Sequence, residues 1–280
     1  MNCKICNRGS KEIFEATILN KYSVKYYQCN NCHFVQTEEP HWLSEAYDNA
    51  IASTDVGLVY RNISFSNIAE KLIKLVFDYK GIFLDYAGGY GLFVRLMRDK
   101  GFNFYRQDIY CQNIFAHNVD IEDLQTKPKF ELVTAFEVFE HLTDPMTDVE
   151  SILKYSGSVL FSTQLLPGNA LSSISDWWYF APESGQHISF YSQKSLEIMA
   201  QRFGYHFFTN GTTLHLFTKK KLGASPFIEI EEIQKSKGRP LLNFLKKIVS
   251  RLEINTVRPV ELESLLQQDF LAAKKKISGL

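Results

Sequence analysis

The sequence predicts an α/β fold with a mostly parallel sheet, preceded by a small cysteine-bearing module and followed by a helical extension. Apolar strand-like runs alternate with stretches of helical period between residues 79 and 218, as in a parallel sheet flanked by helices. The last two runs meet at Asn-Gly in "YHFFTNGTTLHLFTKK", which predicts an antiparallel hairpin at the end of the sheet. Beyond residue 219 the chain is Lys-rich and helical in pattern.

The expected elements follow one another in a regular order. The strands correspond to GIFLDYA, FNFYRQD, FELVTAFEVF and SVLFSTQ, followed by the hairpin. Apolar residues recur with a period of 3.6 over residues 63–77, so we expect a helix before the first strand. Further helices are expected at 92–100, 145–155 and 192–203. In "RPLLNFLKKIVSRL" an apolar stripe predicts a helix that packs on the protein body or on a second copy, in preference to a membrane surface.

Composition narrows the classes of function. Lys plus Arg and Asp plus Glu number 31 each, so no net field attracts the chain to nucleic acid. With 45% apolar and 14% aromatic residues, the chain can build a sizeable core. The first residues carry no apolar stretch of signal-peptide length, and no 18 apolar residues run without interruption. We therefore expect a globular, cytoplasmic protein without a transmembrane segment that does not bind nucleic acid.

Four of the five cysteines form two C-x2-C pairs with 22 residues between the pairs, namely Cys3, Cys6, Cys29 and Cys32. Two disulfides would call for an export signal, and a redox pair for a following βαβ pattern. The spacing instead predicts a tetrahedral zinc site of four thiolates. A module of about 38 residues has too small a core to be stable without a metal ion or a cross-link, so we expect the ion to be structural. Cys111 is expected to be a small buried apolar residue.

A glycine-rich turn, "LDYAGGYGLF", follows the first expected strand. A dinucleotide-binding turn would need a third glycine where Val94 stands. The turn instead resembles the D-x-G-x-G-x-G motif of class I S-adenosylmethionine-dependent methyltransferases, with alanine in place of the first glycine. The motif residues are Asp85, Ala87, Gly89 and Gly91. Alanine adopts most of the same backbone unless φ is positive at that position.

Acidic residues downstream support this resemblance. Asp108 ends the second expected strand, where a carboxylate can accept hydrogen bonds from both ribose hydroxyls. Asp120 corresponds to the acid that meets the adenine amine in these methyltransferases, and the next strand runs into their E-V-x-E-H-L pattern, which adds Glu137 to the implied cofactor-binding set. The resemblance covers residues 79–218 and implies a Rossmann-like fold with S-adenosylmethionine as cofactor. The short interval between Asp108 and Asp120 leaves little room for the usual helix.

The aromatic segment "SDWWYFAPESGQH" forms either a core plug or one wall of a pocket. With the pattern H-x-x-x-Y-S-x-x-S-L that follows, it resembles methyltransferases that carry a four-cysteine zinc module and act on sugars. We expect His187 to be the catalytic base, because a histidine can accept a proton at neutral pH. A structural histidine that bonds loop backbone is the alternative. The candidate substrate residues are Tyr60, Trp177, Trp178, Tyr179 and Tyr191.

One difference from these relatives bears on the acceptor atom. The sugar C-methyltransferases of the group have Glu-His where this chain has Gln186 and His187. Removing a proton from carbon needs a stronger or better supported base than accepting one from a hydroxyl, so we expect an oxygen acceptor. His141 is expected to be a structural residue at a helix start, and Tyr47 is a weaker pocket candidate.

We therefore expect an S-adenosylmethionine-dependent methyltransferase that acts on a hydroxyl of a small molecule, with a sugar or glycan as the expected acceptor. The alternatives are a C-methyltransferase acting on a nucleotide sugar, a dinucleotide-dependent oxidoreductase or epimerase, and a non-catalytic binding module of the same fold, suggested by Ala87 and Gln186. Copies could associate through the C-terminal helices. We expect four parts: a zinc-binding module at 1–38, a helical connector or lid at 39–78, the cofactor-binding core at 79–218 and a helical extension at 219–280.

Overall fold

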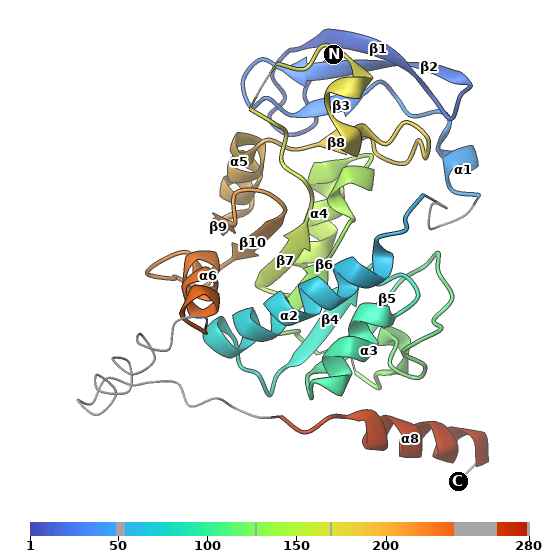
Figure 1. Cartoon of the computed structure of the whole chain (residues 1–280), viewed down its shortest axis with the longest axis vertical. Coiled ribbons are helices and arrows are strands. Elements are labelled where there is room, and N and C mark those ends of the chain that lie inside the picture. Colours follow the sequence, from blue (N-terminus) through green and yellow to red (C-terminus); the bar gives the residue numbers. More distant parts are fainter. Residues whose placement is uncertain (49–53, 127, 169, 238–261, 279–280) are drawn as a thin grey trace.

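The structure is a computed structural model that describes residues 1–48, 54–126, 128–168, 170–237 and 262–278. These residues form two sheets. Figure 1 shows the smaller sheet at one end of the molecule, the larger sheet in the middle and the C-terminal helix at the opposite end.

The larger sheet has six strands in the order β5-β4-β6-β7-β10-β9. The first four of these pair in parallel, whereas β10 is antiparallel to both β7 and β9. This arrangement confirms the predicted Rossmann-like, mostly parallel sheet with a terminal hairpin. The strands are β4 (Ile82–Tyr86), β5 (Asn103–Gln107), β6 (Leu132–Ala135), β7 (Ser158–Ser162), β9 (His206–Thr209) and β10 (Leu214–Thr218).

Strand β6 is shorter than the predicted run FELVTAFEVF. It ends at Ala135, and Glu137 has a positive φ of 54°. Left-handed backbone cannot continue a strand, so the apolar run past Ala135 belongs to a turn. The turn leads into the short 3₁₀ helix η2 (Phe139–His141), which brings charged side chains to the carboxyl end of β6.

Helices cover both faces of the larger sheet, as expected for a parallel sheet. The helices predicted at 92–100, 145–155 and 192–203 are confirmed to within two residues, and the helix before the first strand begins at Leu58. One face carries α2 (Leu58–Val76), α3 (Leu92–Asp99) and α6 (Pro226–Lys237), and the other carries α4 (Pro145–Leu153) and α5 (Gln193–Phe203).

Side-chain alternation in β4 divides the core in two. Phe83 packs with residues of α2 and α3, and its ring stacks on that of Phe104 in β5 at 5.0 Å between centroids. Leu84 packs on the opposite face with residues of α4 and α5. Both side chains are fully buried, because successive residues point to opposite faces and each face is covered by helices.

The smaller sheet is antiparallel, in the order β1-β2-β3-β8. Its first three strands and the short α1 (Leu43–Ala46) come from the N-terminal region, but β8 comes from the segment that follows His187. Chain from the expected core therefore completes the sheet of the N-terminal module. The strands are β1 (Ser10–Ile18), β2 (Tyr22–Cys29), β3 (Val35–Thr37) and β8 (Ser189–Phe190).

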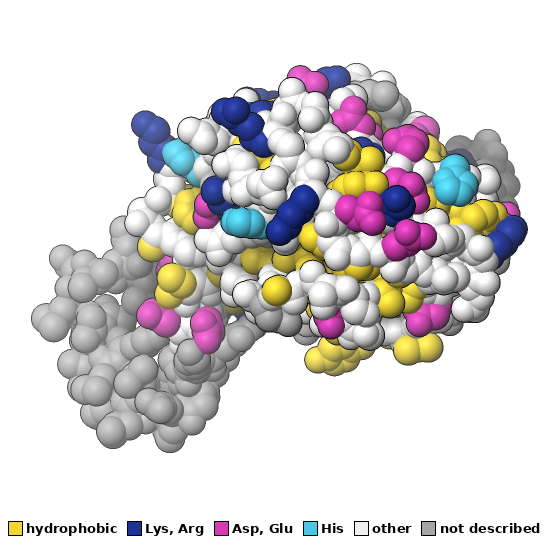
Figure 2. Space-filling view, turned by 90° about the horizontal axis from the view of Figure 1, so that it is seen from above, with side chains coloured by type: hydrophobic (Ala, Val, Ile, Leu, Met, Phe, Trp, Pro, Cys, Tyr) yellow, Lys and Arg dark blue, Asp and Glu magenta, His cyan; other side chains and the backbone are white. Residues whose placement is uncertain are grey.

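The C-terminal helix α8 (Leu266–Ser278) is anchored on α3, where Asp269 forms ion pairs with Arg95 at 2.8 Å and Arg98 at 2.6 Å. The helix predicted in "RPLLNFLKKIVSRL" lies outside the described residues. Among the residues described, no helix combines the length and apolarity needed to cross a membrane. On the face drawn in Figure 2, lysines and arginines are scattered among acidic and uncharged side chains.

Candidate active site

Three residues of the turn between β4 and α3 have positive φ, namely Ala87 at 54°, Gly89 at 55° and Gly91 at 85°. Glycine is required at position 91, because a Cβ atom there would lie 2.7 Å from Oδ1 of Asn113. Ala87 therefore replaces a motif glycine at a position where φ is positive. An L-residue in this region is strained by about 1–2 kcal/mol, so alanine does not simply mimic glycine here.

Replacing Ala87 by glycine should stabilise the protein by about 0.5–1 kcal/mol. The relief of strain exceeds the entropy that glycine adds to the unfolded chain. Denaturant unfolding measures the change, and Ala200→Gly inside α5 is the control, expected to destabilise by about 1 kcal/mol. Destabilisation by Ala87→Gly would show instead that packing of its methyl group outweighs the strain.

Asp85, in β4, lies under the glycine turn with its carboxyl group close to Gly88. Its side chain is buried at 3% exposure, and it accepts a hydrogen bond of 2.6 Å from the hydroxyl of Thr134. Burial, with the nearby charge of Asp108, raises the pKa of this carboxyl to about 7. A Cβ atom at position 88 would lie 2.6 Å from Oδ2 of Asp85, so Gly88 allows the turn to pass close over the carboxyl group.

Asp108 ties the turn to the loop after β5. Its Oδ2 accepts a hydrogen bond of 2.9 Å from the N–H of Gly89, and its Oδ1 accepts bonds from the N–H groups of Tyr110 at 2.8 Å and Cys111 at 2.7 Å. Three backbone donors fix the orientation of the carboxylate. The side chain is half-buried beside the turn, and its contact with the ribose of the cofactor stays a prediction.

Arg106 holds two of the predicted cofactor residues together and was not singled out from the sequence. Its guanidinium donates to the carbonyl of Gly89 at 2.5 Å and to Oδ1 of Asp120 at 2.6 Å. The other oxygen of Asp120 accepts from Asn113 at 3.0 Å. No α-helix lies between Asp108 and Asp120, in agreement with their short separation. The sequence feature that could have pointed to Arg106 is an arginine at an inward-facing position of a strand, because a buried guanidinium needs hydrogen-bond partners.

His141 and His187 face each other with ring centroids 4.9 Å apart. Nδ1 of His187 lies 2.7 Å from the carbonyl oxygen of Tyr179, and Nδ1 of His141 lies 3.1 Å from that of Gln186. A carbonyl only accepts, so these contacts assign the proton to Nδ1 of each ring and leave the Nε2 lone pairs free. Burial lowers the pKa of both rings, to about 3 for His141, so both are neutral at neutral pH.

Glu140 is fully buried beside the histidines and was not singled out from the sequence. Neither carboxylate oxygen has a hydrogen-bond partner of normal geometry among the described residues, although the hydroxyls of Tyr179 and Thr163 lie nearby. Burial raises the pKa of Glu140 to about 7. Ligand atoms of Glu140, His141 and His187 lie within 4.8 Å of one another, which is close enough for the three side chains to hold one ion.

Glu137 lies beside Glu140 and His187. It accepts a hydrogen bond of 2.6 Å from the hydroxyl of Ser162 and lies 3.4 Å from Nε of Arg61, which also pairs with Asp55 at 2.7 Å. Burial and the neighbouring charge of Glu140 raise the pKa of Glu137 to about 7. The structure therefore places this predicted cofactor residue beside the histidine pair.

Tyr47 connects the two parts of the site. Its hydroxyl lies 3.0 Å from Nδ1 of His141, and its ring stacks on Tyr110 with centroids 6.3 Å apart. Tyr110 is in turn held by Asp108. The glycine turn and the histidine pair thus share the carboxyl edge of β4, β5 and β6, which is where open α/β sheets bind ligands.

Among the aromatic candidates, Tyr179 lies beside the histidine pair. Its ring centroid is 4.6 Å from that of His187, and its buried hydroxyl is near Glu140. The segment is a core plug over most of its length. The remaining candidates are placed as follows: Trp177 is buried in the core of the smaller sheet, Tyr191 is buried with its hydroxyl bonded to the carbonyl of Phe139, and Trp178 and Tyr60 are exposed.

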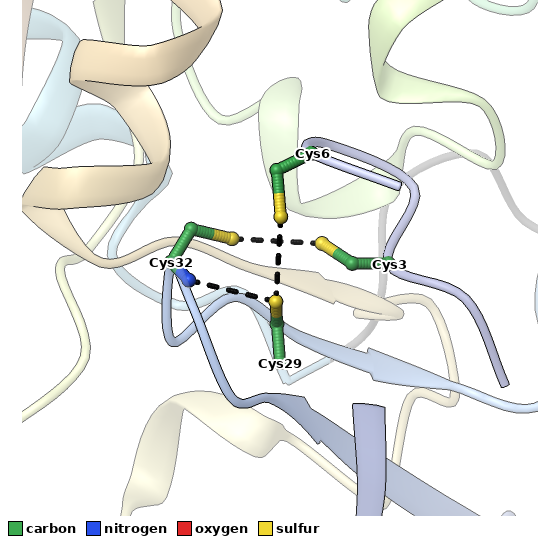
Figure 3. Close-up of side chains that lie close together, drawn as sticks. All are labelled: Cys3, Cys6, Cys29 and Cys32. Atoms are coloured by element: carbon green, nitrogen blue, oxygen red, sulfur yellow. Dashed lines mark hydrogen bonds between the residues drawn. The ribbon is translucent and has the colours of Figure 1, made fainter. Parts of the chain in front are cut away.

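The four cysteines of the N-terminal module point toward one centre, as Figure 3 shows. The Sγ atoms of Cys3 and Cys32 are 3.5 Å apart, and those of Cys6 and Cys29 are 3.4 Å apart. All four side chains are buried and none forms a disulfide. Backbone N–H groups point at Sγ of Cys3 and Cys29, an arrangement that stabilises thiolates. Four converging thiols fit the donor set of a tetrahedral zinc site.

The chain belongs to the methyltransferase domain family, whose sequence profile matches residues 60–208, more than half of its length. The predicted enzyme class, a methyltransferase, is thereby confirmed, and the dinucleotide-dependent oxidoreductase is not supported. No curated protein matches the sequence.

Among solved structures, CalO1, a methyltransferase in calicheamicin biosynthesis in its SAH-bound form, is 15% identical, with 63% of this chain and 61% of CalO1 covered and a TM-score of 0.40. The plantazolicin methyltransferase BpumL is 12% identical, with 64% of this chain and 93% of BpumL covered and a TM-score of 0.46. Human N-acetylserotonin methyltransferase with SAM is 13% identical, with 64% and 66% covered and a TM-score of 0.39. The chain thus spans less than two thirds of CalO1.

Proposed function

We propose that this chain transfers the methyl group of S-adenosylmethionine to a hydroxyl oxygen of a small molecule, with sugars or glycans as the acceptor class. The observation that carries the proposal is the shared sheet edge at which Tyr47 joins a D-x-A-x-G-x-G turn to a pair of neutral histidines. The cofactor supplies an electrophilic methyl group on a positively charged sulfur. The protein has to align the hydroxyl, exclude water and take up a proton.

The residues of the turn fit this cofactor. Positive φ at residues 87, 89 and 91 keeps backbone rather than side chains at the carboxyl end of β4, and Asp85 and Asp108 hold that backbone in place. No phosphate has to be bound, so the missing third glycine of dinucleotide sites is no obstacle. The proposed cofactor-binding set is Asp85, Ala87, Gly89, Gly91, Asp108, Asp120 and Glu137.

On the acceptor side, His187 is proposed to act on the substrate hydroxyl. Its Nδ1–H is held by the carbonyl of Tyr179, which leaves Nε2 as its free nitrogen. The side-chain amide of Gln186 donates a hydrogen bond to the carbonyl of Ala46 at 2.8 Å. Gln186 therefore has a structural contact and no basic group, which supports oxygen rather than carbon as the acceptor. A glutamate has no N–H to make this bond, so the residue that differs from the C-methyltransferases stabilises the fold instead of supplying a base.

Asp108→Ala should weaken S-adenosylmethionine binding by about 1.5–3 kcal/mol, roughly 10- to 150-fold, through loss of a charge-assisted hydrogen bond. Calorimetry measures the affinity, and circular dichroism checks that the fold is kept. Asp78→Ala, at an exposed position before β4, is the matched control and should leave the affinity unchanged. Tight NAD binding, or no binding of S-adenosylmethionine by the unmodified protein, would overturn the assignment.

The remaining proposals concern the rest of the chain. The four converging cysteines support a structural zinc ion in a module at residues 1–38. The contact of Tyr47 with His141 supports a role for the connector at 39–78 as a lid over the site. Exposed Leu266, Phe270 and Leu271 on α8 support association of copies through the extension at 219–280. We place the protein in the cytoplasm, acting on a small molecule and not on nucleic acid.

A further inference from the structure

We propose that Glu140, His141 and His187 bind a divalent transition-metal cation on which the acceptor hydroxyl is held. Their ligand atoms lie within 4.8 Å of one another, and both histidine rings retain some exposed surface while Glu140 is fully buried. Two imidazoles and one carboxylate form a donor set of the kind that binds zinc or iron(II) with positions left open for substrate.

The hydrogen bonds around the two histidines suit metal ligands as well as they suit free bases. Each ring presents Nδ1 to a backbone carbonyl, that of Tyr179 for His187 and that of Gln186 for His141. A metal-bound histidine almost always donates its other ring N–H in this way, which fixes the tautomer and the ring orientation. Tyr47 adds a second contact to His141, so that ring is held from two sides.

Glu140 is the independent observation that points to an ion. Neither oxygen of its fully buried carboxylate has a hydrogen-bond partner of normal geometry among the described residues, and the hydroxyls that lie beside it, those of Tyr179 and Thr163, are neutral donors that do not compensate its charge. A buried carboxylate without partners is destabilising by several kcal/mol unless it is protonated, paired or bound to a metal. Ser162 and Arg61 bond the neighbouring Glu137, so Arg61 acts on Glu140 only through its charge and donates no hydrogen bond to it.

The charges of the surroundings also favour a cation of charge two. Asp55, Glu137 and Glu140 face one guanidinium, that of Arg61, which already pairs with two of them. With all three carboxylates ionised, which a bound cation would promote, two negative charges would be uncompensated among these four residues. A divalent cation between Glu140 and the histidines would neutralise them.

The catalytic consequence rests on the proposed function, whereas the cation binding does not. A coordinated hydroxyl has a lowered pKa, so its O–H bond breaks and the proton leaves to solvent water. The oxygen then forms a bond to the methyl carbon as the carbon–sulfur bond breaks, and the sulfonium leaves as a neutral thioether. His187 would serve this transfer as a ligand and not as the base itself.

Mn²⁺ is the probe that separates this site from the cysteine site, because four thiolates select zinc over manganese. The full-length protein, cleared of loosely bound metal by dialysis, is titrated with Mn²⁺ while electron paramagnetic resonance follows the free ion. We expect about one Mn²⁺ per chain, and roughly 100-fold or greater loss of affinity in both Glu140→Gln and His187→Asn. Glu150→Gln, exposed on α4, is the matched control and should bind as the unmodified protein does.

Thermal unfolding gives a readout that needs no substrate. Metal-free Glu140→Gln should be at least as stable as the unmodified protein, since an unpaired buried charge is removed, but it should lose the stabilisation by Mn²⁺. Absence of Mn²⁺ binding together with no metal beyond one equivalent per chain by elemental analysis, or equal Mn²⁺ binding by Glu140→Gln, would overturn the metal site. If His187→Ala then still abolished methyl transfer, the proposed function would stand with His187 as a free base. Mn²⁺ binding without methyl transfer to any hydroxyl would leave the metal site intact and reject the proposed function.

Discussion

Replacing His187 by alanine should lower turnover by roughly 100-fold or more, the usual scale for a group that activates the acceptor. The affinity for S-adenosylmethionine should stay nearly unchanged, because the turn proposed to hold the cofactor is built from Asp85, Asp108 and the glycines, not from His187. Steady-state methyl transfer to a confirmed acceptor, with calorimetry for the cofactor, measures the two quantities separately.

Asparagine at the same position separates chemistry from folding. The amide N–H of His187→Asn can still donate to the carbonyl of Tyr179, but no nitrogen reaches the cluster. If both variants lose turnover equally, the effect is due to the loss of Nε2. If only His187→Ala is unstable, its loss of turnover is due to the missing hydrogen bond to the carbonyl of Tyr179. His206→Ala, exposed on β9, should leave turnover unchanged. Full activity in both His187 variants would mean that positioning alone drives the transfer.

Cys29→Ser should release one zinc equivalent per chain and destabilise the smaller sheet. Serine is a poor zinc ligand, and the binding free energy of a structural zinc site is folding free energy, on the order of 10 kcal/mol in small zinc domains. Cys29 ends β2, opposite Ser10 of β1, so the loss acts directly on strand pairing. Elemental analysis and thermal denaturation measure the two effects.

Cys111→Ser is the matched control, because this cysteine lies in the loop after β5 and away from the other four. It should keep the full zinc content and near-normal stability. Unchanged zinc content in Cys29→Ser, or no zinc in freshly purified protein, would reject the four-cysteine site.

The strands and helices of the larger sheet could be predicted because apolar runs and helical period are local signals. The end of β6 could not, since the apolar run continues past Ala135 while the backbone turns at Glu137. From the sequence we could say only that Ala87 would be strained if its φ were positive. The sign of φ at a turn depends on the surrounding fold, and here it is positive.

The cofactor side of the site lies close to its motif in sequence and was therefore easier to predict than the acceptor side. Tyr47, Glu140 and His187 meet only after the chain has folded, at sequence separations that no period or spacing encodes. Glu140 stood inside the quoted E-V-x-E-H-L pattern, but its significance comes from burial without a partner, which a sequence does not display. Arg106 was missed because its partners lie in the turn after β4 and in the segment between β5 and η1 (Ile121–Asp123), which only the fold brings together.

The pairing of β3 with β8 sets the order in which the chain can mature during synthesis. Val35 pairs with Phe190, so the smaller sheet stays open at one edge until most of the larger sheet's strands have been made. All four cysteines are made early, yet the strand that completes their sheet arrives late, and such long-range pairing is slow to form. The segment made first is thus completed among the last, and the exposed edge of β3 is the part of the nascent chain most open to wrong pairing with another copy.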